Sequence, residues 1–505
     1  MIIGRRNVRG TQPNTFAFDP VRNVHLQPPF GSADIAQIDE ACELASHAFD
    51  TFRSLPADER ARFLERIAEN ILDLGEDLIE RARAETGLSQ ARLVGERART
   101  VGQLRLFASV VRDGRWLDVA VDPAMPNRQP NPRADLRRRN VPLGSVAVFG
   151  ASNFPLAFSV AGGDTASAFA AGCPVVVKAH PAHPGTSELV AKAVRRAAIE
   201  CGMPDGVFSM ISGAAHEIGR ALVMHPAIKA VGFTGSRQGG LALAALAATR
   251  KAPIPVFAEM SSINPVFVLP EALATRASLL AQGLMQSINL GVGQFCTNPG
   301  VIVLINGQPA QAFVAELTGL MREQGKQAML APNIAKSYRR STHLRADAPG
   351  VSTLTSMSSP DETCIAEPAL FAVSAKAFLA DDSLQSEIFG PASLVVYCDS
   401  ADEMLVVAEH LEGQLTCTIQ MGNGDQALAR ELLPTLERKC GRILANDYPT
   451  GVDVCHAMVH GGPFPATTDS RFTSVGTAAI ARFLRPVCYQ NFPQALLPKP
   501  LQDAD

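Results

Sequence analysis

The strongest constraint on the fold is a repeated pattern between residues 141 and 258, where short β-branched runs alternate with alanine-rich runs. The strand-like runs cover 144–150, 173–178, 207–210, 229–233 and 254–258, and the helical runs cover 157–171, 187–200, 217–224 and 241–249. Repeated β-α-β units of this kind predict an α/β fold in which helices cover a parallel sheet. Ligands bind such sheets at the carboxyl ends of the strands, so the residues that follow each strand are the first candidates for a site.

The chain has 505 residues, which is too long for one hydrophobic core, so we expect two or three domains. Helices are predicted from about 33 to 113, and a second, looser α/β pattern runs from 263 to about 445. A proline- and arginine-rich stretch at 122–133 indicates a connector or an edge ribbon. The tail from 449 is rich in glycine, proline, threonine and phenylalanine, and we expect it to wrap a neighbour without a core of its own. The predicted domains are therefore 1–121 with 141–258, then 259–448, with 122–140 and 449–505 as ribbon and tail.

Composition excludes several classes of function. Hydrophobic residues make up 47% of the chain and the net charge is -3, which is typical of a globular protein and not of a nucleic-acid or polybasic membrane binder. No run of about 18 purely apolar residues predicts a membrane helix, and no signal-like apolar core follows Met1. The ten scattered cysteines form no C-x-x-C pair, which favours reduced thiols in a cytoplasmic protein.

Two groups of histidine and cysteine residues are candidate metal ligands. Cys455, His456 and His460 form one group, and His180 and His183 form the other. Neither group has a second ligand pair at zinc-finger spacing, so we predict no metal site.

Cys296 stands on a stretch with strong turn chemistry. Gly291 and Gly293 precede it, and Asn298-Pro299-Gly300 follows. Glycine and Asn-Pro-Gly place the thiol on a shaped loop, where a cysteine is a candidate nucleophile. On this stretch alone, a loop cysteine without a role explains the pattern equally well.

Three other features follow strands of the first pattern. The glycine-rich turn 235–240 lies between a strand and a helix, where backbone N–H groups favour phosphate, although a tight turn also explains the glycines. Lys178 is either a solvated strand end or a group that reaches a nucleotide. Glu259 is either a paired acid or a partly desolvated carboxylate with a raised pKa, suited to general base catalysis.

Four motifs in a fixed order resemble the aldehyde dehydrogenase superfamily, and the resemblance runs from about residue 30 to the end. The motifs are Phe233-Thr234-Gly235-Ser236, Phe257-Ala258-Glu259-Met260, Gly293-Gln294-Phe295-Cys296 and Glu387-Ile388-Phe389-Gly390-Pro391. Residues 177–187, 459–467 and 482–490 are similar to one branch of it. That branch contains NADP-accepting 2,5-dioxopentanoate (α-ketoglutaric semialdehyde) dehydrogenases and fatty aldehyde dehydrogenases.

The resemblance implies a Rossmann-type cofactor domain in 1–121 and 141–258, an α/β catalytic domain, and a small oligomerisation ribbon. It implies that Cys296 attacks the aldehyde carbon, that the Asn153 amide and the Cys296 N–H hold the oxyanion, and that Glu259 activates water to hydrolyse the thioester. It also implies the cofactor contacts, which are Lys178 near the adenosine ribose, Gly235, Ser236 and Gly240 near the pyrophosphate, Glu387 on the nicotinamide ribose, and Phe389 beside it.

The chain departs from the common pattern of the superfamily in two places. Met260-Ser261-Ser262 follows Glu259 where Leu-Gly-Gly is usual, which changes the loop and keeps the acid. Pro181 stands where many NAD-preferring members carry a glutamate three residues after the lysine. A carboxylate there would repel a 2′-phosphate, so its absence predicts that NADP is preferred and that NAD is possible.

The resemblance favours oxidation of 2,5-dioxopentanoate to 2-oxoglutarate by a homodimer or homotetramer. NADP-dependent oxidation of medium- or long-chain aliphatic aldehydes is the alternative. Acyl transfer to coenzyme A is disfavoured because Glu259 is present, and an inert nucleotide-binding or structural homologue would be expected to lose Cys296, Asn153 or Glu259. A dicarboxylic semialdehyde needs a cation or donor for its distal carboxylate. Arg99, Gln103, Arg105 and Arg471 are available for this, and a surface role is open for each.

Overall fold

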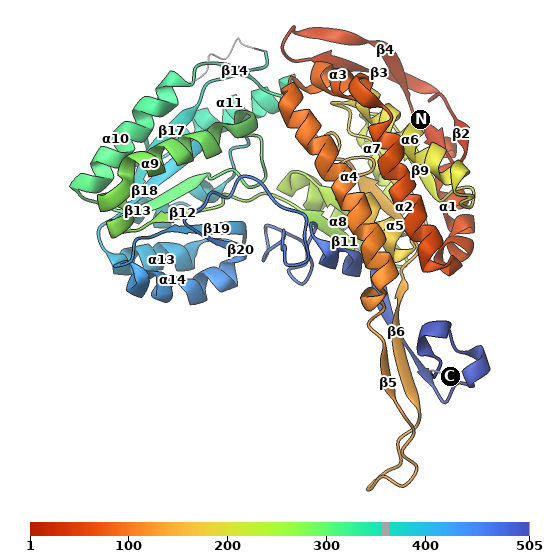
Figure 1. Ribbon diagram of the computed structural model, residues 1–505. Helices are drawn as coiled ribbons and strands as arrows, with labels where there is room; N and C mark the ends of the chain where they lie inside the picture. The colour runs from red at the N-terminus through yellow and green to blue at the C-terminus, as the bar shows by residue number, and fades with distance from the viewer. Residues whose placement is uncertain (356–362, 504–505) are drawn as a thin grey trace.

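The computed structural model describes residues 1–355 and 363–503, which form two α/β lobes with a ribbon that projects from one of them (Figure 1). Residues 356–362 of the predicted second domain and 504–505 of the predicted tail lie outside the described residues. Among the described helices, none is both long and apolar enough to cross a membrane.

The first lobe is built on a seven-stranded sheet with the order β11-β10-β7-β8-β9-β1-β2. Strands β7 to β11 are parallel, whereas β1 is antiparallel to β9. Strands β8 and β9 lie on one side of β7, and β10 and β11 lie on the other side. The strand order therefore reverses between β7 and β10, and sheets of this kind bind ligands at such a point. The strands are β1 (Ile2–Ile3), β2 (Arg6–Asn7), β7 (Ser145–Phe149), β8 (Val175–Lys178), β9 (Phe208–Ile211), β10 (Ile228–Thr234) and β11 (Val256–Glu259).

Helices cover both faces of this sheet and bury two separate hydrophobic clusters. One face holds α2 (Ala57–Leu72), α4 (Gln90–Asp113), α5 (Gly163–Ala171) and α6 (Pro184–Glu200), and α3 (Gly75–Thr86) packs on α4 and α6. The other face holds α1 (Ile35–Ser54), α7 (His216–Met224) and α8 (Arg237–Ala248).

The local sequence determines where the helices begin and end. Asp34 caps α1 by accepting the Gln37 N–H at 2.8 Å, and α4 ends at Gly114 in the left-handed conformation.

The second lobe has its own seven-stranded sheet, with the order β15-β17-β18-β13-β12-β19-β20 and only β15 antiparallel. The strands are β12 (Val266–Val268), β13 (Val301–Ile305), β15 (Ser352–Thr353), β17 (Ala369–Ser374), β18 (Ala392–Cys398), β19 (Gln414–Gln420) and β20 (Cys440–Ala445). Helices α9 (Pro270–Asn289) and α10 (Gln308–Glu323) cover one face. Helices α11 (Pro332–Ala346), α12 (Ala375–Ala380), α13 (Ala401–His410) and α14 (Gln426–Lys439) cover the other. Strands β12 and β13, near the centre of this sheet, are apolar along their whole length because both faces are covered.

Three smaller sheets complete the described structure. Strands β5 (Ala120–Asp122), β6 (Leu136–Pro142) and β21 (Leu484–Gln490) form an antiparallel ribbon that extends away from both lobes (Figure 1). The hairpin of β3 (Gln12–Asp19) and β4 (Val24–Ser32) packs on α3 and α6, and β14 (Gln327–Ala328) pairs with β16 (Ile365–Ala366).

Most predicted elements are present, and three differences have physical causes. The helical run predicted at 157–171 begins only at Gly163, because 150–162 forms a buried series of turns. Strands β1 to β4 and β17 were not predicted, since their residues show no clear period. The tail was predicted to wrap a neighbour, and its first part also packs within its own chain, a contact that was not predicted. The Met260 N–H donates to Ala466 O (2.8 Å) and the Thr468 N–H to Ala258 O (3.1 Å), so this segment follows β11 of its own chain.

Candidate active site

The loop that carries Cys296 is held from two directions. Gly293 has φ +63°, and a Cβ there would lie 2.3 Å from the carbonyl carbon of Gly390, so only glycine fits. Val292 has φ +58°, a costly conformation for a β-branched residue and one that clusters at functional sites. The Asn264 amide donates to Cys296 O (2.8 Å) and to Asn298 O (2.9 Å). The thiol therefore stands on a rigid turn.

Glu259, at the end of β11, lies beside the thiol together with a histidine from the tail. His460 Nε2 is 3.0 Å from Glu259 Oε1 and 3.4 Å from Cys296 Sγ, and the His460 and Glu259 side chains are both fully buried. The Ser474 hydroxyl donates to the other Glu259 oxygen at 3.0 Å. The tail segment thus brings an imidazole into contact with both the carboxylate and the thiol.

The surroundings shift the pKa values of the Glu259 carboxyl and the Cys296 thiol in opposite directions. Burial acts to raise the pKa of Glu259, but the neighbouring His460, with hydrogen bonds from His460, Cys296 and Ser474, outweighs burial and lowers that pKa. Of the two readings left open for Glu259, the paired acid fits the structure and the raised pKa is wrong, because the sequence does not reveal the histidine partner. Burial and then the Glu259 charge raise the pKa of Cys296 well above its ordinary value, with Arg99 acting in the opposite sense. At neutral pH the cluster consequently holds a protonated thiol beside an ionised carboxylate.

Asn153 lies in the buried turn that follows β7. Its amide Nδ2 donates to Gln294 O at 3.0 Å, two residues before the cysteine. Asn153 and Cys296 line the same cavity. An amide donor is therefore available beside the thiol.

A cavity of about 930 Å³ runs from the cysteine to the reversal point of the first sheet. It contains every site residue predicted from the sequence except Gly240, namely Asn153, Lys178, Gly235, Ser236, Glu259, Cys296, Glu387 and Phe389. This volume lies in the upper range for small-molecule and cofactor sites.

The cavity carries chemistry suited to a nucleotide along its first-lobe wall. Burial lowers the pKa of Lys178, at the end of β8, to about 8. Ser236 caps the twelve-residue helix α8 by accepting the Gly239 N–H at 3.2 Å, and Ser236, Gln238 and Gly239 place the start of this helix on the cavity lining. Gly240 lies one position further along α8, and a Cβ there would meet Met260 Sδ at 2.6 Å. The cavity lining at this turn therefore comes from Gly235, Ser236, Gln238 and Gly239 and not from Gly240.

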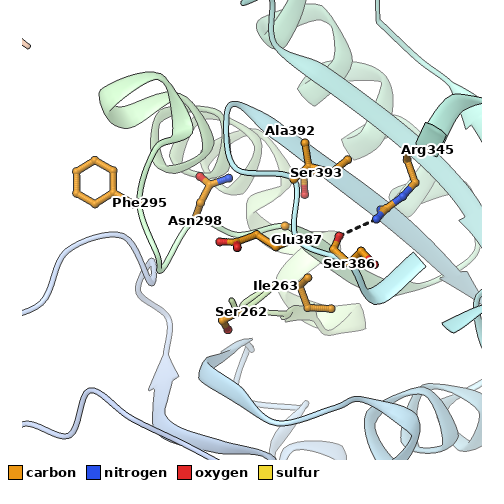
Figure 2. A pocket seen from close by; sticks show the side chains of 11 residues that line it. Ser262, Ile263, Phe295, Asn298, Arg345, Ser386, Glu387, Ala392 and Ser393 are labelled. Carbon is orange, nitrogen blue, oxygen red and sulfur yellow. Dashed lines mark hydrogen bonds between the residues drawn. The ribbon is translucent and has the colours of Figure 1, made fainter. Parts of the chain in front are cut away.

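Glu387 lies between the cofactor-sized cavity and a small pocket behind the cysteine loop (Figure 2). Figure 2 shows the Arg345 guanidinium reaching the backbone of Ser386, where Nη2 donates to Ser386 O at 2.9 Å and so fixes the residue before Glu387. Burial, with a smaller contribution from the Glu259 charge, raises the pKa of Glu387 to about 8 against a hydrogen bond from Ser261. Glu387 is thus largely neutral at pH 7.

One face of α4 packs against the buried turns of 150–162, so the surface role left open for Arg99 and Gln103 is wrong. Glu96 accepts the Leu156 and Ala157 N–H groups at 2.9 Å each, and Gln103 is buried. The Arg99 guanidinium lies 5.3 Å from the Phe158 ring, and its Nη1 donates to Val452 O. In the described chain, Arg99 Nε and Nη2 are buried without a hydrogen-bond partner. Arg105 is exposed, and Arg471 is exposed and paired with Asp469.

The candidate metal ligands of the two sequence groups do not come together in the structure. His183 is a satisfied core residue, with Nε2 2.8 Å from Ala151 O and Nδ1 3.1 Å from Ser187 Oγ, and His180 stacks on it. Cys455 and His456 are exposed, whereas His460 points to Cys296. Sequence reasoning missed His460 and Ser474 as site residues. The available signal was the similarity of 459–467 to one branch of the superfamily.

Comparison with known proteins decides the family. The model of the aldehyde dehydrogenase family matches residues 17–470. The chain belongs to the aldehyde dehydrogenase family. This aldehyde dehydrogenase is 57% identical to "Alpha-ketoglutaric semialdehyde dehydrogenase 2" of Azospirillum brasilense, over all of this chain and 96% of that protein. It is 49% identical to "Alpha-ketoglutaric semialdehyde dehydrogenase" of Acinetobacter baylyi, over 99% of this chain and 96% of that protein.

Solved structures show the same fold at low sequence identity. A 1-pyrroline-5-carboxylate dehydrogenase from Thermus with bound NAD has a TM-score of 0.81 at 22% identity, covering 97% of this aldehyde dehydrogenase and 92% of that chain. A betaine aldehyde dehydrogenase from Staphylococcus aureus has a TM-score of 0.83 at 19% identity, covering 98% and 96%. The predicted α/β aldehyde-dehydrogenase-like fold is therefore confirmed, and the chain is an oxidoreductase that acts on aldehydes.

Proposed function

We propose that this aldehyde dehydrogenase oxidises 2,5-dioxopentanoate to 2-oxoglutarate, with NADP preferred over NAD. The observation that carries the chemistry is the cluster of Cys296, Glu259 and His460 at one end of a dinucleotide-sized cavity. The printed names of the two relatives at 57% and 49% identity support the substrate. An inert homologue is not favoured, because thiol, carboxylate and amide are all present in one cavity.

The residues of the chain divide the reaction into two half-reactions. The ionised Glu259, directly or through His460, accepts the Cys296 proton as Sγ bonds to the aldehyde carbon, and the Asn153 amide and the Cys296 N–H stabilise the resulting oxyanion. Bound NADP supplies an acceptor for the hydride that leaves this carbon. Cys296 then holds the acyl group as a thioester. Glu259 first releases the thiol proton to solvent and then removes a proton from water, and the hydroxyl adds to the acyl carbon. The C–S bond breaks to release the acid, which ionises to the carboxylate, and the proton held by Glu259 returns to the sulfur to restore the thiol.

The cavity residues fit a nicotinamide dinucleotide. Lys178 would lie at the adenosine ribose, Gly235 and Ser236 at the pyrophosphate, and Glu387 with Phe389 at the nicotinamide ribose. The first-lobe residues 1–121 and 141–258 would form the cofactor domain and 259–448 the catalytic domain. A buried carboxyl that is largely neutral, such as Glu387, can exchange hydrogen bonds with ribose hydroxyls without the cost of a buried charge.

A preference for NADP is the first testable prediction. Pro181 lines the adenosine end of the cavity with no carboxylate at that position, and Lys178, His216 and Arg220 line the same region, although Glu217 does as well. The 2′-phosphate of NADP would lie near the basic side chains of Lys178, His216 and Arg220, with Glu217 as the one nearby acid. We expect kcat/KM for NADP to exceed that for NAD. A ratio that favours NAD more than about tenfold, equal to about 1.4 kcal/mol, would contradict the prediction.

Arg99 distinguishes the two substrate classes. Its guanidinium is near enough to Cys296 for each to affect the pKa of the other, and two of its nitrogens are buried without partners among the described residues. A buried unpartnered donor costs free energy that a bound carboxylate removes. A medium-chain aliphatic aldehyde offers no such acceptor. Arg99 is therefore our candidate for the distal carboxylate of a dicarboxylic semialdehyde.

Replacing Arg99 with methionine, which keeps the length and removes the charge, tests this assignment. We expect kcat/KM for 2,5-dioxopentanoate to fall about 10- to 100-fold, mainly through KM, because a charge-assisted hydrogen bond contributes about 1.5–3 kcal/mol. The kcat/KM for hexanal should change by less than about threefold. Steady-state kinetics with both aldehydes measure the difference.

Arg105→Met, at an exposed position on the same helix, is the matched control and should leave both aldehydes unaffected. An equal loss for both aldehydes in Arg99→Met would assign Arg99 to support of the 449–452 loop. A wild-type enzyme that prefers hexanal would instead favour the alternative function.

The ribbon supports assembly into a homodimer or homotetramer. Strands β21 and β5 are the edges of its sheet, and Val119, Val121 and Met125 are exposed on or beside it. Unpaired strand edges with apolar side chains favour pairing with another chain. The ribbon 122–140 and the last part of the tail are the proposed contact elements, in an enzyme that we expect to act in the cytoplasm.

A further inference from the structure

Three atoms of the active site converge as the ligands of one metal ion would. Glu259 Oε1, Cys296 Sγ and His460 Nε2 all lie within 4.8 Å of one another. Two of the separations are 3.0 Å, between the carboxylate and the imidazole, and 3.4 Å, between the imidazole and the sulfur. Zinc bonds of about 2.0–2.3 Å place the ligands of a tetrahedral site about 3.5 Å apart. The cluster needs little adjustment to meet this geometry.

The chemical types of the three ligands favour zinc over the alkaline-earth ions. Thiolate, imidazole and carboxylate are the protein ligands that Zn²⁺ prefers, whereas Mg²⁺ and Ca²⁺ prefer sets made only of oxygen. Zinc sites with an open position have three protein ligands and a fourth site for water or another molecule. Glu259 and Cys296 line the large cavity, so an ion has a route to the cluster and space for a fourth ligand.

The surroundings predict reversible binding and not a resident metal. The Ser474 hydroxyl orients Glu259, as an outer partner of a metal ligand does. By contrast, His460 Nδ1 is buried and has no hydrogen-bond partner in the described part of the chain. Histidines of tightly held metals almost always donate this second N–H, and its lack of a partner weakens affinity.

We propose that Cys296, His460 and Glu259 form a zinc-binding site that reversibly inactivates the enzyme. As the S–Zn bond forms, the thiol proton leaves to solvent, and no electron is transferred. The ion occupies the nucleophile and the base at once, so no aldehyde can be attacked while it is bound. The inference concerns the cluster itself and holds whichever aldehyde is the substrate. Failure of the substrate proposal would leave it unaffected.

Zinc titration of the full-length, reduced, metal-free protein tests the proposal. Zinc chloride is added without cofactor, bound zinc is counted after equilibrium dialysis, and residual activity is measured on the same samples. We expect one zinc per chain, loss of activity in proportion to its occupancy, and complete recovery on addition of a chelator. Loss of activity that a chelator does not reverse would indicate oxidation of the thiol and overturn the proposal.

Variants identify the ligands by zinc binding and not by activity. His460→Asn and Cys296→Ala should each weaken zinc binding by at least about tenfold. The double variant Cys455→Ala/His456→Asn alters an exposed cysteine–histidine pair in the same tail and should keep both zinc binding and inhibition. Thermal unfolding checks that each variant is folded. Unchanged zinc affinity in His460→Asn and Cys296→Ala, or loss of the zinc in the double variant alone, would overturn the assignment.

Discussion

Replacing Cys296 with alanine is expected to lower aldehyde oxidation by about 10⁴-fold or more while the chain keeps its fold. The thiol is the only sulfur in the described active-site cluster, and no other nucleophile there can carry an acyl group through the second half-reaction. The substitution removes one sulfur from a turn whose backbone Asn264, Gly293 and Asn298 hold independently, so stability should change little. Steady-state NADPH formation and a thermal unfolding curve measure the two quantities.

Cys455→Ala is the matched control, because Cys455 is exposed and belongs to the tail that carries His460. This control should retain full activity. Binding of NADP to Cys296→Ala, measured by calorimetry, should also persist, which separates loss of chemistry from loss of the cofactor site. Residual oxidation above about 1% of the wild-type rate would require a second nucleophile and would contradict the covalent mechanism.

The architecture was predictable because it rests on periodicity. Apolar strands recur from β7 to β11, and two of them end in charged residues, Lys178 and Glu259. Parallel strands place their carboxyl ends at one edge of a sheet, so these residues had to gather there. The same reasoning extends to the cysteine loop, whose glycines adopt conformations that few other residues can.

The chemistry of the cluster was not predictable, because it depends on a segment without a period. His460 lies in a stretch of glycine and proline whose path is fixed by individual bonds and not by a repeating pattern, such as the bond from the His460 N–H to the Thr473 hydroxyl (2.8 Å) and the bond from the Met260 N–H to Ala466 O (2.8 Å). Its approach reverses the direction of the Glu259 pKa shift that burial alone would give. The inward orientation of Arg99 could not be predicted for a related reason. The inward face of α4 also carries Glu96 and Gln103, so buried and solvated sides of the helix look alike in sequence.

Replacing Glu259 with glutamine is expected to separate the two half-reactions. Steady turnover should fall about 10²- to 10⁴-fold, the range over which a general base contributes, because water is no longer activated. A first burst of NADPH should survive. The reason is that His460 Nε2 remains 3.4 Å from Cys296 Sγ and can accept the thiol proton during attack on the aldehyde. Glutamine keeps the shape of the side chain and an oxygen for the Ser474 hydroxyl, which limits structural loss.

Rapid-mixing measurements of NADPH, compared with those of His460→Asn, decide between two roles for the carboxylate. His460→Asn keeps Glu259, so it should retain deacylation and slow the burst if the imidazole relays the thiol proton. A Glu259→Gln enzyme without any burst would show that Glu259 itself must act before hydride leaves the substrate. In that case the raised pKa of Cys296 would make direct proton transfer to Glu259 the obligatory first step, and His460 would be a positioning residue for the carboxylate.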